Sequence, residues 1–448
     1  MDLVTLIPSA GNLVFTIAAF VLALSIIVTV HEYGHYIVGR WTGIKAEVFS
    51  LGFGPVLVSR IDRHGTKWQI AALPLGGFVR FMGDASATSA RPSPDVARMD
   101  QDTRRHTMHG APLWARTATV AAGPLFNFAL AILVFAALSL ARGVAVDPPT
   151  VGALVALPPD AVEQGGLAPG DTILALNGVP TPDHVSLLRA VETLPVDAPP
   201  VYTVRRDGAE RDVPGPFPFP PIVSSVQPRT AAADAGLRPG DVVVAIAGEP
   251  VRTFRELQAR VAENGGQPVA IRIWRAGETL EFSLTPKSMD LPLTDGSFET
   301  RWIIGMNGGL AFESATRMPG PVEALSYGVD QLGYILQSSL SALYHMLTGA
   351  ISSCNLSGPI GIAETSGAAA SQGLETFIWF IAMLSAAVGL LNLFPIPVLD
   401  GGHLVFYLYE GITGRPPSDR AMRFLTAVGL AMLLGLMAFA LTNDLVCP

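Results

Sequence analysis

Two histidines flank a glutamate near one end of the chain, in the run His31-Glu32-Tyr33-Gly34-His35. In a helix, residues four apart lie on one face, so the rings of His31 and His35 could bind one metal ion. The carboxylate between them, Glu32, could act as a base toward a water activated by that ion. This H-E-x-x-H pattern is typical of zinc hydrolases and predicts a Zn2+ site with Glu32 as the catalytic residue. The alternative is that both histidines are hydrogen-bonded residues inside a helix bundle.

A catalytic zinc ion usually takes three protein ligands, so a third is needed. The best candidate is Asp400, because residues 392–402 contain two prolines and two glycines that must break a helix in an apolar part of the chain. Asp400 could instead cap the broken helix, and His403 could replace or assist it as a ligand. At the start of this segment, Asn392 is a candidate hydrogen-bond donor to the oxyanion or the substrate backbone. It could equally serve helix packing.

Four uncharged runs are long enough to cross a bilayer as helices, at residues 3–30, 117–141, 376–399 and 424–442. Half of the 448 residues are apolar and only 15% are charged. Both observations predict a polytopic α-helical membrane protein with four transmembrane helices, in contact with the lipid bilayer. The first run lacks a basic start and a cleavage site, so we expect a retained span rather than a signal peptide. Ionisable residues inside an apolar span are costly and usually have a function.

Basic residues are concentrated in residues 39–116 and 400–423, which predicts that these connections are cytoplasmic. The long segment 142–375 should then face outward. With this orientation the two histidines and Asp400 reach the same depth, near the cytoplasmic face. A formal net charge of -8 without a basic stripe gives no indication of nucleic-acid binding. The two cysteines are too few for a disulfide scaffold, and the sequence leaves their pairing open.

The first cytoplasmic segment alternates polar and apolar residues at 56–61 and 68–73, around a turn at 62–65, which predicts a β-hairpin. Residues 74–82 could extend it. An exposed strand edge there could hold an extended substrate by β-addition, with Gly76, Gly77 and Phe78 as candidate contacts. The alternative is a hairpin that only supports the membrane surface. Residues 84–110 read as a loop.

The outward segment contains the motif G-L-x-P-G-D twice, at residues 166–171 and 236–241, 70 residues apart. Each copy is followed by an apolar strand-like run and a turn, so we expect two small β-rich modules. The turns differ, because the first copy has Asn177-Gly178 and the second has Ala247-Gly248. The predicted domain boundaries are transmembrane helix 1 at 1–40, hairpin and loop at 41–112, transmembrane helix 2 at 113–142, module 1 at 148–216, module 2 at 217–288, a linker at 289–330, an interfacial amphipathic helix and loop at 331–372, transmembrane helix 3 at 373–403 and transmembrane helix 4 at 422–444.

With these residues assembled, the chain resembles the site-2 protease family of intramembrane zinc metalloproteases, and most closely its regulator-of-sigma-E protease branch. The resemblance covers nearly the whole chain, and its motifs together are highly specific. Besides the two segments already described, they are Gly52-Phe53-Gly54-Pro55, Ala122-Gly123-Pro124 with Asn127, and Gly358-Pro359-Ile360-Gly361.

The resemblance implies zinc bound by His31, His35 and Asp400, with Glu32 catalytic and Asn392 helping to hold the substrate. It implies that the hairpin is membrane-associated and clamps the substrate. It also implies that the two modules are PDZ-like domains in the periplasm, which act as a filter against untrimmed substrates. The implied location is the bacterial inner membrane.

The implied reaction is cleavage within the span of a single-span membrane protein, such as an anti-sigma factor already cut outside, or a remnant signal peptide. Two other functions compete with it. One is a catalytically silent, membrane-anchored PDZ scaffold, which the intact Glu32 disfavours. The other is a metal transporter, which fits poorly because the spans show no inverted repeat.

Overall fold

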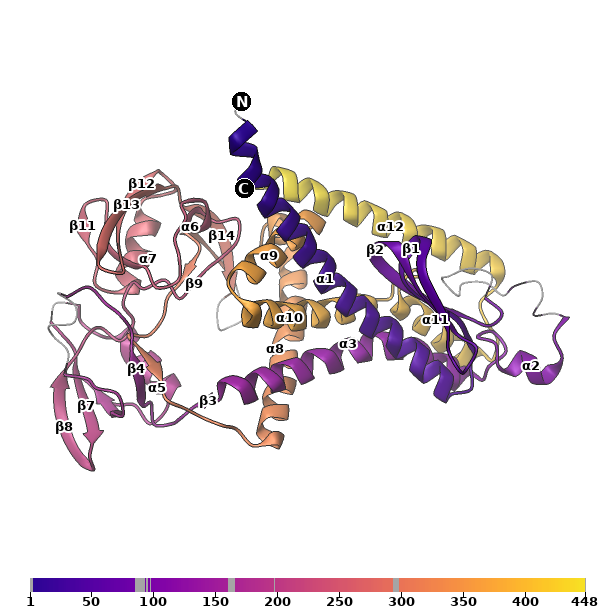
Figure 1. The fold of residues 1–448 in the computed structure, drawn as a ribbon, viewed down its shortest axis with the longest axis horizontal. Helices are drawn as coiled ribbons and strands as arrows, with labels where there is room; N and C mark the ends of the chain where they lie inside the picture. The colour runs from indigo at the N-terminus through magenta and orange to yellow at the C-terminus, as the bar shows by residue number, and fades with distance from the viewer. Residues whose placement is uncertain are drawn as a thin grey trace. The chain divides into compact units, whose positions relative to one another are not determined.

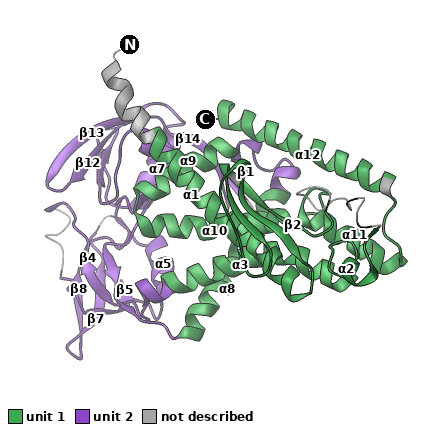
Figure 2. Ribbon diagram, turned by 45° about the vertical axis from the view of Figure 1, so that its right-hand side comes forward, with its two compact units in different colours: residues 1–138, 321–344, 356–447 green, residues 139–320, 345–355, 448 purple. Residues whose placement is uncertain are grey.

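The computed structural model describes residues 3–84, 93–159 except 94, 95 and 97, 166–292 except 197, and 298–447. The chain divides into two compact units, drawn in different colours in Figure 2. Unit 1 consists of residues 1–138, 321–344 and 356–447, and it contains the long apolar helices. Unit 2 consists of residues 139–320 and 345–355, and it is rich in β-structure.

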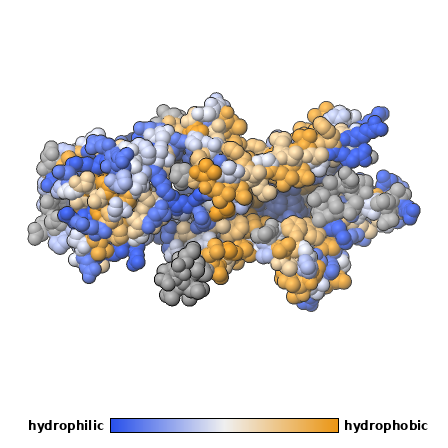
Figure 3. Space-filling model, turned by 90° about the horizontal axis from the view of Figure 1, so that it is seen from above, coloured by the Kyte–Doolittle hydropathy of each residue, from blue (hydrophilic) through white to orange (hydrophobic). Residues whose placement is uncertain are grey.

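Within the described residues, four helices are long and apolar enough to cross a membrane, as the sequence predicts. They are α1 (Leu3–Trp41), α3 (Leu113–Arg142), α10 (Leu374–Asn392) and α12 (Asp419–Val446) (Figure 1). Many of their large apolar side chains face outward, and Figure 3 shows broad hydrophobic areas on the surface. Exposed apolar area of this extent is unusual in a soluble monomer and is expected of helices surrounded by lipid.

The remaining helices of unit 1 are α2 (Gln101–Arg105), α8 (Pro321–Leu347, of which residues 321–344 lie in the unit), α9 (Pro359–Ser371) and α11 (Asp400–Thr413). Two apolar clusters hold the spans together. Ala23 and Ile27 of α1 pack against α9 and α10, and Phe135 of α3 packs against α8 and α10. Helices α1, α3, α8 and α9 are therefore joined through α10, which takes part in both clusters.

Two predicted boundaries in unit 1 are wrong. The third span ends at Asn392 rather than near residue 399, because a turn containing Pro395 and Pro397 follows and proline cannot supply the helical N–H. The connection after Asp400 is itself helical, as α11. The amphipathic helix predicted from residue 331 begins ten residues earlier, at Pro321.

The predicted hairpin is present and is longer than the alternating pattern indicated. It consists of β1 (Ala46–Ile61) and β2 (Lys67–Phe81). In its middle, before the chain reaches the turn, β1 bends at Gly52 and Gly54, which have φ of +87° and +85°. Because of this bend, residues 48–51 lie opposite both residues 67–70 and residues 77–80. Among the described pairings, the last part of β2 has a partner on one side only and forms an edge of this small sheet. Of the predicted loop at 84–110, residues 85–92, 94, 95 and 97 lie outside the described residues, and residues 101–105 form the helix α2 instead.

Unit 2 contains two four-stranded sheets of identical topology, which confirms the repeat seen in the sequence. The first has the order β6-β5-β7-β8 and the second β11-β10-β12-β13. Their strands are β5 (Thr172–Leu176), β6 (Val179–Pro180), β7 (Val201–Arg206), β8 (Ala209–Pro214), β10 (Val242–Ile246), β11 (Glu249–Pro250), β12 (Val269–Arg275) and β13 (Glu278–Leu284). In each sheet one helix follows the first two strands in the chain: α5 (His184–Glu192) follows β6, and α7 (Phe254–Glu263) follows β11. The short α6 (Ala231–Asp234) precedes β10.

The aspartate that ends each G-L-x-P-G-D motif has the same structural role in both modules. Asp171 forms a two-pronged ion pair with Arg206, with both nitrogen–oxygen distances 2.6 Å. Asp241 does the same with Arg275, at 2.6 and 2.7 Å. Each carboxylate also accepts a backbone N–H from three residues earlier. The motif therefore ties the turn before the first strand to the third strand of its sheet.

The predicted linker at residues 289–330 is wrong, because it contains five short strands and the start of α8. β14 (Lys287–Pro292) and β15 (Phe298–Ile303) form a hairpin, and β16 (Met306–Asn307) pairs with β9 (Ser225–Val226). The chain then returns to module 1, where β17 (Phe312–Ser314) pairs with β4 (Val151–Leu154) and β18 (Thr316–Arg317) with β3 (Val144–Ala145). Such short strands carry too few residues for a recognisable alternation.

Candidate metal centre

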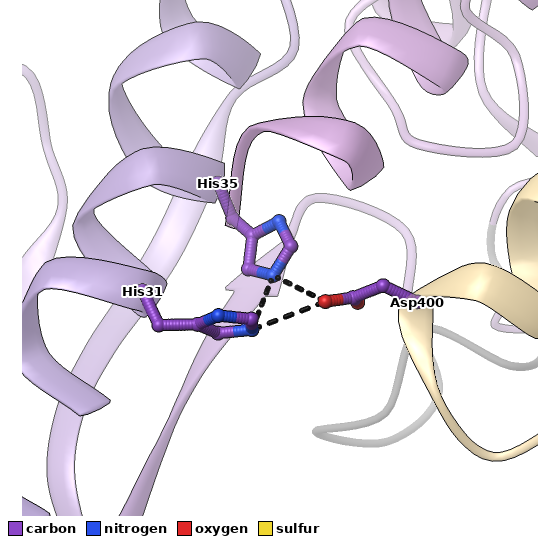
Figure 4. Close-up of side chains that lie close together, drawn as sticks. All are labelled: His31, His35 and Asp400. Atoms are coloured by element: carbon purple, nitrogen blue, oxygen red, sulfur yellow. Dashed lines mark hydrogen bonds and ion pairs between the residues drawn. The ribbon is translucent and has the colours of Figure 1, made fainter. Parts of the chain in front are cut away.

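The two histidines of the motif lie one helical turn apart on α1 and point toward each other (Figure 4). Their Nε2 atoms are 3.2 Å apart, and each of the two residues is 9% exposed. Nδ1 of His35 donates a hydrogen bond to the backbone carbonyl of Thr119 at 2.9 Å. Because a carbonyl can only accept, this bond leaves the Nε2 lone pair of His35 free for a metal ion.

Asp400 reaches the same point from the far end of the sequence, as the first residue of α11. Its Oδ2 lies 3.1 Å from Nε2 of His31 and 3.5 Å from Nε2 of His35. Two glycines allow this approach. A side chain at Gly401 would collide with the carbonyls of the turn that ends α10, and one at Gly402 would meet the carbonyl of Ile396. The tight turn therefore fixes the start of α11 directly beside α1.

The three ligand atoms are spaced as a zinc ion requires. Bonds of about 2.0–2.1 Å in a tetrahedron place neighbouring ligand atoms about 3.3 Å apart. The three separations here are 3.1, 3.2 and 3.5 Å. Among the described residues, His31, His35 and Asp400 form the one group of at least three metal-binding side chains whose ligand atoms gather this closely. The donor set, two imidazoles and a carboxylate, also suits zinc.

Helix α3 covers the site without filling it. A Cβ at Gly123 would collide with the His35 ring and lie 2.8 Å from Cε1 of His31. Gly34 of α1 makes a matching close contact, since a Cβ there would lie 2.6 Å from the carbonyl of Ala122. The two glycines let α1 and α3 approach closely, and the histidine rings lie where a side chain at residue 123 would be.

Glu32 faces the edge of the hairpin. A Cβ at Gly77 would lie 3.3 Å from Cγ of Glu32, and Val79 follows two residues later on the same strand. The edge of β2 and the Glu32 side chain are therefore in contact. Phe78 stacks with Phe53 at 6.1 Å between ring centroids, next to Gly76, so all three predicted hairpin contacts lie on this strand.

Asp62 in the hairpin turn attaches the hairpin to α1. It accepts hydrogen bonds from Tyr36 and from the Trp68 indole, each 3.0 Å long. Burial alone would raise the pKa of Asp62, but these bonds and the backbone N–H groups of Thr66 and His64 outweigh it and lower the pKa to about 2. The carboxylate is therefore ionised at neutral pH. It holds the hairpin to α1 through Tyr36, the residue after His35.

Two other predicted residues lie outside the cluster of ligand atoms. Asn392 is the last residue of α10, and His403 lies one turn after Asp400 on α11, with its ring next to Phe406. The geometry thus favours Asp400 over His403 as the third ligand. Thr119 and Gly123 carry no chemistry that the sequence could signal, since one contributes a backbone carbonyl and the other the absence of a side chain.

Known proteins resemble this chain over nearly its whole length. The profile of Peptidase family M50 matches residues 19–436. A protein of Agrobacterium fabrum named as a zinc metalloprotease is 35% identical over 445 residues, which cover 98% of both chains. The regulator of sigma-E protease of Salmonella typhimurium is 34% identical over 460 aligned positions, which cover 97% of this chain and 99% of that protein. The chain therefore belongs to peptidase family M50, and it is a membrane-embedded zinc metalloprotease of the site-2 protease type.

Proposed function

We propose that His31, His35 and Asp400 hold the zinc ion and that Glu32 is the general base. The observation that carries this proposal is the spacing of the three ligand atoms, 3.1–3.5 Å apart, from helices more than 360 residues apart in sequence. When bound there, zinc supplies a Lewis acid that activates water and polarises a peptide carbonyl. Glu32 takes the proton from the attacking water and passes it to the leaving amine.

The substrate in this proposal is the transmembrane segment of a single-span membrane protein, bound in an extended form. A peptide bond within a helix is shielded, so the segment must unwind before attack. The edge of β2 next to Glu32 supports this proposal, because an extended chain added to that edge would run past the base. Gly76, Gly77 and Phe78 would contact the added strand, and Asn392 would donate to its backbone.

The substrate class follows the similarity to the regulator of sigma-E protease. On this basis the substrates are anti-sigma factors already cut outside the membrane, with remnant signal peptides as a second class. The two modules of unit 2 would be PDZ-like domains in the periplasm that exclude untrimmed substrates. The active site would lie near the cytoplasmic face of the inner membrane.

Two observations support this orientation. The basic residues cluster in the segments on either side of the metal centre, at 39–116 and 400–423. Cys354 and Cys447 are both disulfide-bonded, and both fall in segments that this orientation places outside the cytoplasm. Disulfides persist in the periplasm and are rare in the cytoplasm.

The proposal is tested with purified full-length protein and a single-span reporter. Glu32→Gln should bind zinc like the wild type and lose cleavage by about 10²–10⁴-fold, because only the base is removed. Asp400→Ala should lose zinc, and His403→Ala, on the same helix, is the matched control that should keep it. Wild-type cleavage by Glu32→Gln would refute the mechanism, and zinc loss in His403→Ala alone would move the third ligand.

A further inference from the structure

Helix α3 presents three successive turns to the metal centre. Thr119, Gly123 and Asn127 are four residues apart and so lie on one face of the helix. The Thr119 carbonyl holds the His35 ring, and Gly123 leaves the space beside both rings. Asn127 is the third member of this face and contacts the remaining ring, that of His31.

The amide of Asn127 is completely buried and only half used. Its Nδ2 lies 3.3 Å from Nδ1 of His31. Its Oδ1 has no hydrogen-bond partner among the described residues. An unpaired buried carbonyl is rare and costly, so this oxygen calls for a donor. The oxygen and nitrogen of an asparagine amide exchange places when the group turns over.

The chemistry of His31 decides which orientation a metal needs. A neutral imidazole carries one proton, and Nε2 can bind a metal only when that proton is on Nδ1. An Nδ1–H group needs an acceptor, and the amide nitrogen of Asn127 is a donor. With the amide turned over, Oδ1 accepts the Nδ1 proton, and the orphaned oxygen gains its partner. The second ligand needs no such choice, because a backbone carbonyl fixes His35.

We propose that Asn127 is a positioning residue of the metal centre, whose amide oxygen accepts the Nδ1 proton of His31 when the metal is bound. The inference rests on the proposed ligand set. Partners of this kind fix both the tautomer and the orientation of a metal-binding histidine, and their loss typically weakens metal binding 10–100-fold. Asn127 would thus act on metal affinity through His31, without touching the metal.

The test measures zinc affinity of the full-length protein in detergent by competition with a chelating dye. Asn127→Leu, which keeps the branching at Cγ and removes the acceptor, should bind zinc about 10–100-fold more weakly than the wild type. Asn127→Asp, which can only accept, should bind zinc nearly as well as the wild type. The matched control is Ser385→Ala. It removes the 3.0 Å hydrogen bond from Ser385 to the backbone carbonyl of Asn127 and leaves the side-chain amide untouched. It should bind zinc like the wild type.

The outcomes separate this inference from the proposed function. If His31→Ala keeps its zinc affinity, the ligand set itself fails. If His31→Ala loses zinc while Asn127→Leu binds it normally, the ligand set stands and the role of Asn127 is refuted. Equal losses in Asn127→Leu and Asn127→Asp would mean that Asn127 only packs. Should Asn127→Leu not fold, Asn127→Ala takes its place, because it also removes the acceptor, and normal zinc affinity in that variant would refute the role of Asn127.

Discussion

Space at the metal centre is created by a missing side chain. Gly123 stands where any Cβ would enter the volume beside the rings of His31 and His35. A single methyl group there should prevent the rings from converging on one ion.

Gly123→Ala should bind zinc at least about tenfold more weakly than the wild type, because the added methyl group displaces the ligand rings. The control is Gly333→Ala in α8, where no heavy atom lies within 4 Å of the added Cβ. That variant should bind zinc normally. The same dye-competition measurement compares the two, and normal zinc affinity in Gly123→Ala would show that the rings can move aside.

At this scale the sequence identifies the groups that carry charge or lone pairs on side chains. His31, Glu32, His35 and Asp400 are recognisable because the chemistry restricts which residue types can serve. The contributions of Thr119 and Gly123 could not be predicted, because any residue has a backbone carbonyl, and a glycine reveals its use only once the crossing of α1 and α3 is known.

Among the elements, α11 needs an anchor of its own, since its first residue must stay beside α1. Arg116 at the start of α3 forms two hydrogen bonds with Glu410 of α11, at 2.6 and 3.1 Å, and its guanidinium lies over the ring of Tyr407. The side chains of Arg116 and Glu410 are only 14% and 18% exposed. This ion pair joins the element that carries Asp400 to the element that covers the histidines.

Arg116→Met should destabilise unit 1 by about 3–5 kcal/mol, because it leaves the Glu410 carboxylate buried without its partner. The double variant with Glu410→Met should recover part of that loss, since neither charge then remains. Thermal unfolding of the four proteins of this cycle measures the coupling. Equal stability of Arg116→Met and the wild type would mean that water solvates the carboxylate.

The turns of the two modules are equivalent in shape although their sequences differ. Asn177 and Ala247 have φ of +46° and +51°, and both precede a glycine. Asparagine tolerates this conformation, and the Asn177 side chain also accepts the N–H of Val201 at 2.7 Å. Alanine does neither, so module 2 carries backbone strain at Ala247 that module 1 avoids.

Ala247→Asn should therefore stabilise module 2 by about 1 kcal/mol, the usual cost of a left-handed non-glycine residue. The mirror variant Asn177→Ala should destabilise module 1 by at least that amount, because it also loses a hydrogen bond. Hydrogen exchange of the strand amides in the full-length protein measures each module separately. A destabilising effect of Ala247→Asn would contradict this account of the strain.

The extent of the elements was predicted less well than their existence. The hairpin, the helix break before Asp400 and the amphipathic α8 were all indicated by local patterns. Their boundaries depend on tertiary contacts. The bend of β1, for example, lets residues 48–51 pair on both sides, and a period-two pattern cannot signal that arrangement.

For the molecule as a whole, the buried Asp171 of the first repeated motif makes stability depend on pH. Burial would raise the pKa of Asp171, but the ion pair with Arg206 and the N–H of Ala168 outweigh it and lower the pKa below its usual value. The ionised form thus stabilises the folded state above about pH 4, the pKa of an unfolded aspartate. That contribution is lost as the pH falls through the lowered pKa of the folded state.

Asp171→Asn should consequently unfold at a lower temperature than the wild type at neutral pH, and the difference should shrink steadily below pH 4. Melting curves of both proteins from pH 7 to the most acidic pH at which they stay soluble test this. Asp212→Asn, at a carboxylate on the exposed strand β8, serves as the control. A difference that persists unchanged in acid would show that the Asp171 ion pair does not supply it.

The number of modules follows from the sequence, because two copies of a six-residue motif, 70 residues apart, are unlikely to arise by chance. Their connectivity does not. The sequence predicts two consecutive, separate modules followed by a linker at 289–330. In the structure, β17 and β18 return to the strands with which module 1 begins. Pairing between strands some 160 residues apart depends on the completed fold and leaves no local signal.

This return makes module 2 an insertion within module 1. The backbone oxygen of Pro218 accepts the N–H of Ala311 at 2.9 Å, so the chain enters and leaves the insertion at neighbouring points. A gene in which codon 218 is joined to codon 311 by a short spacer should still encode a folded module 1, detectable by its protease resistance. Cutting the gene after the first repeat should not, because the final strands would be missing. A one-module ancestor could thus have acquired its second module in a single step, without disturbing the helices that flank both.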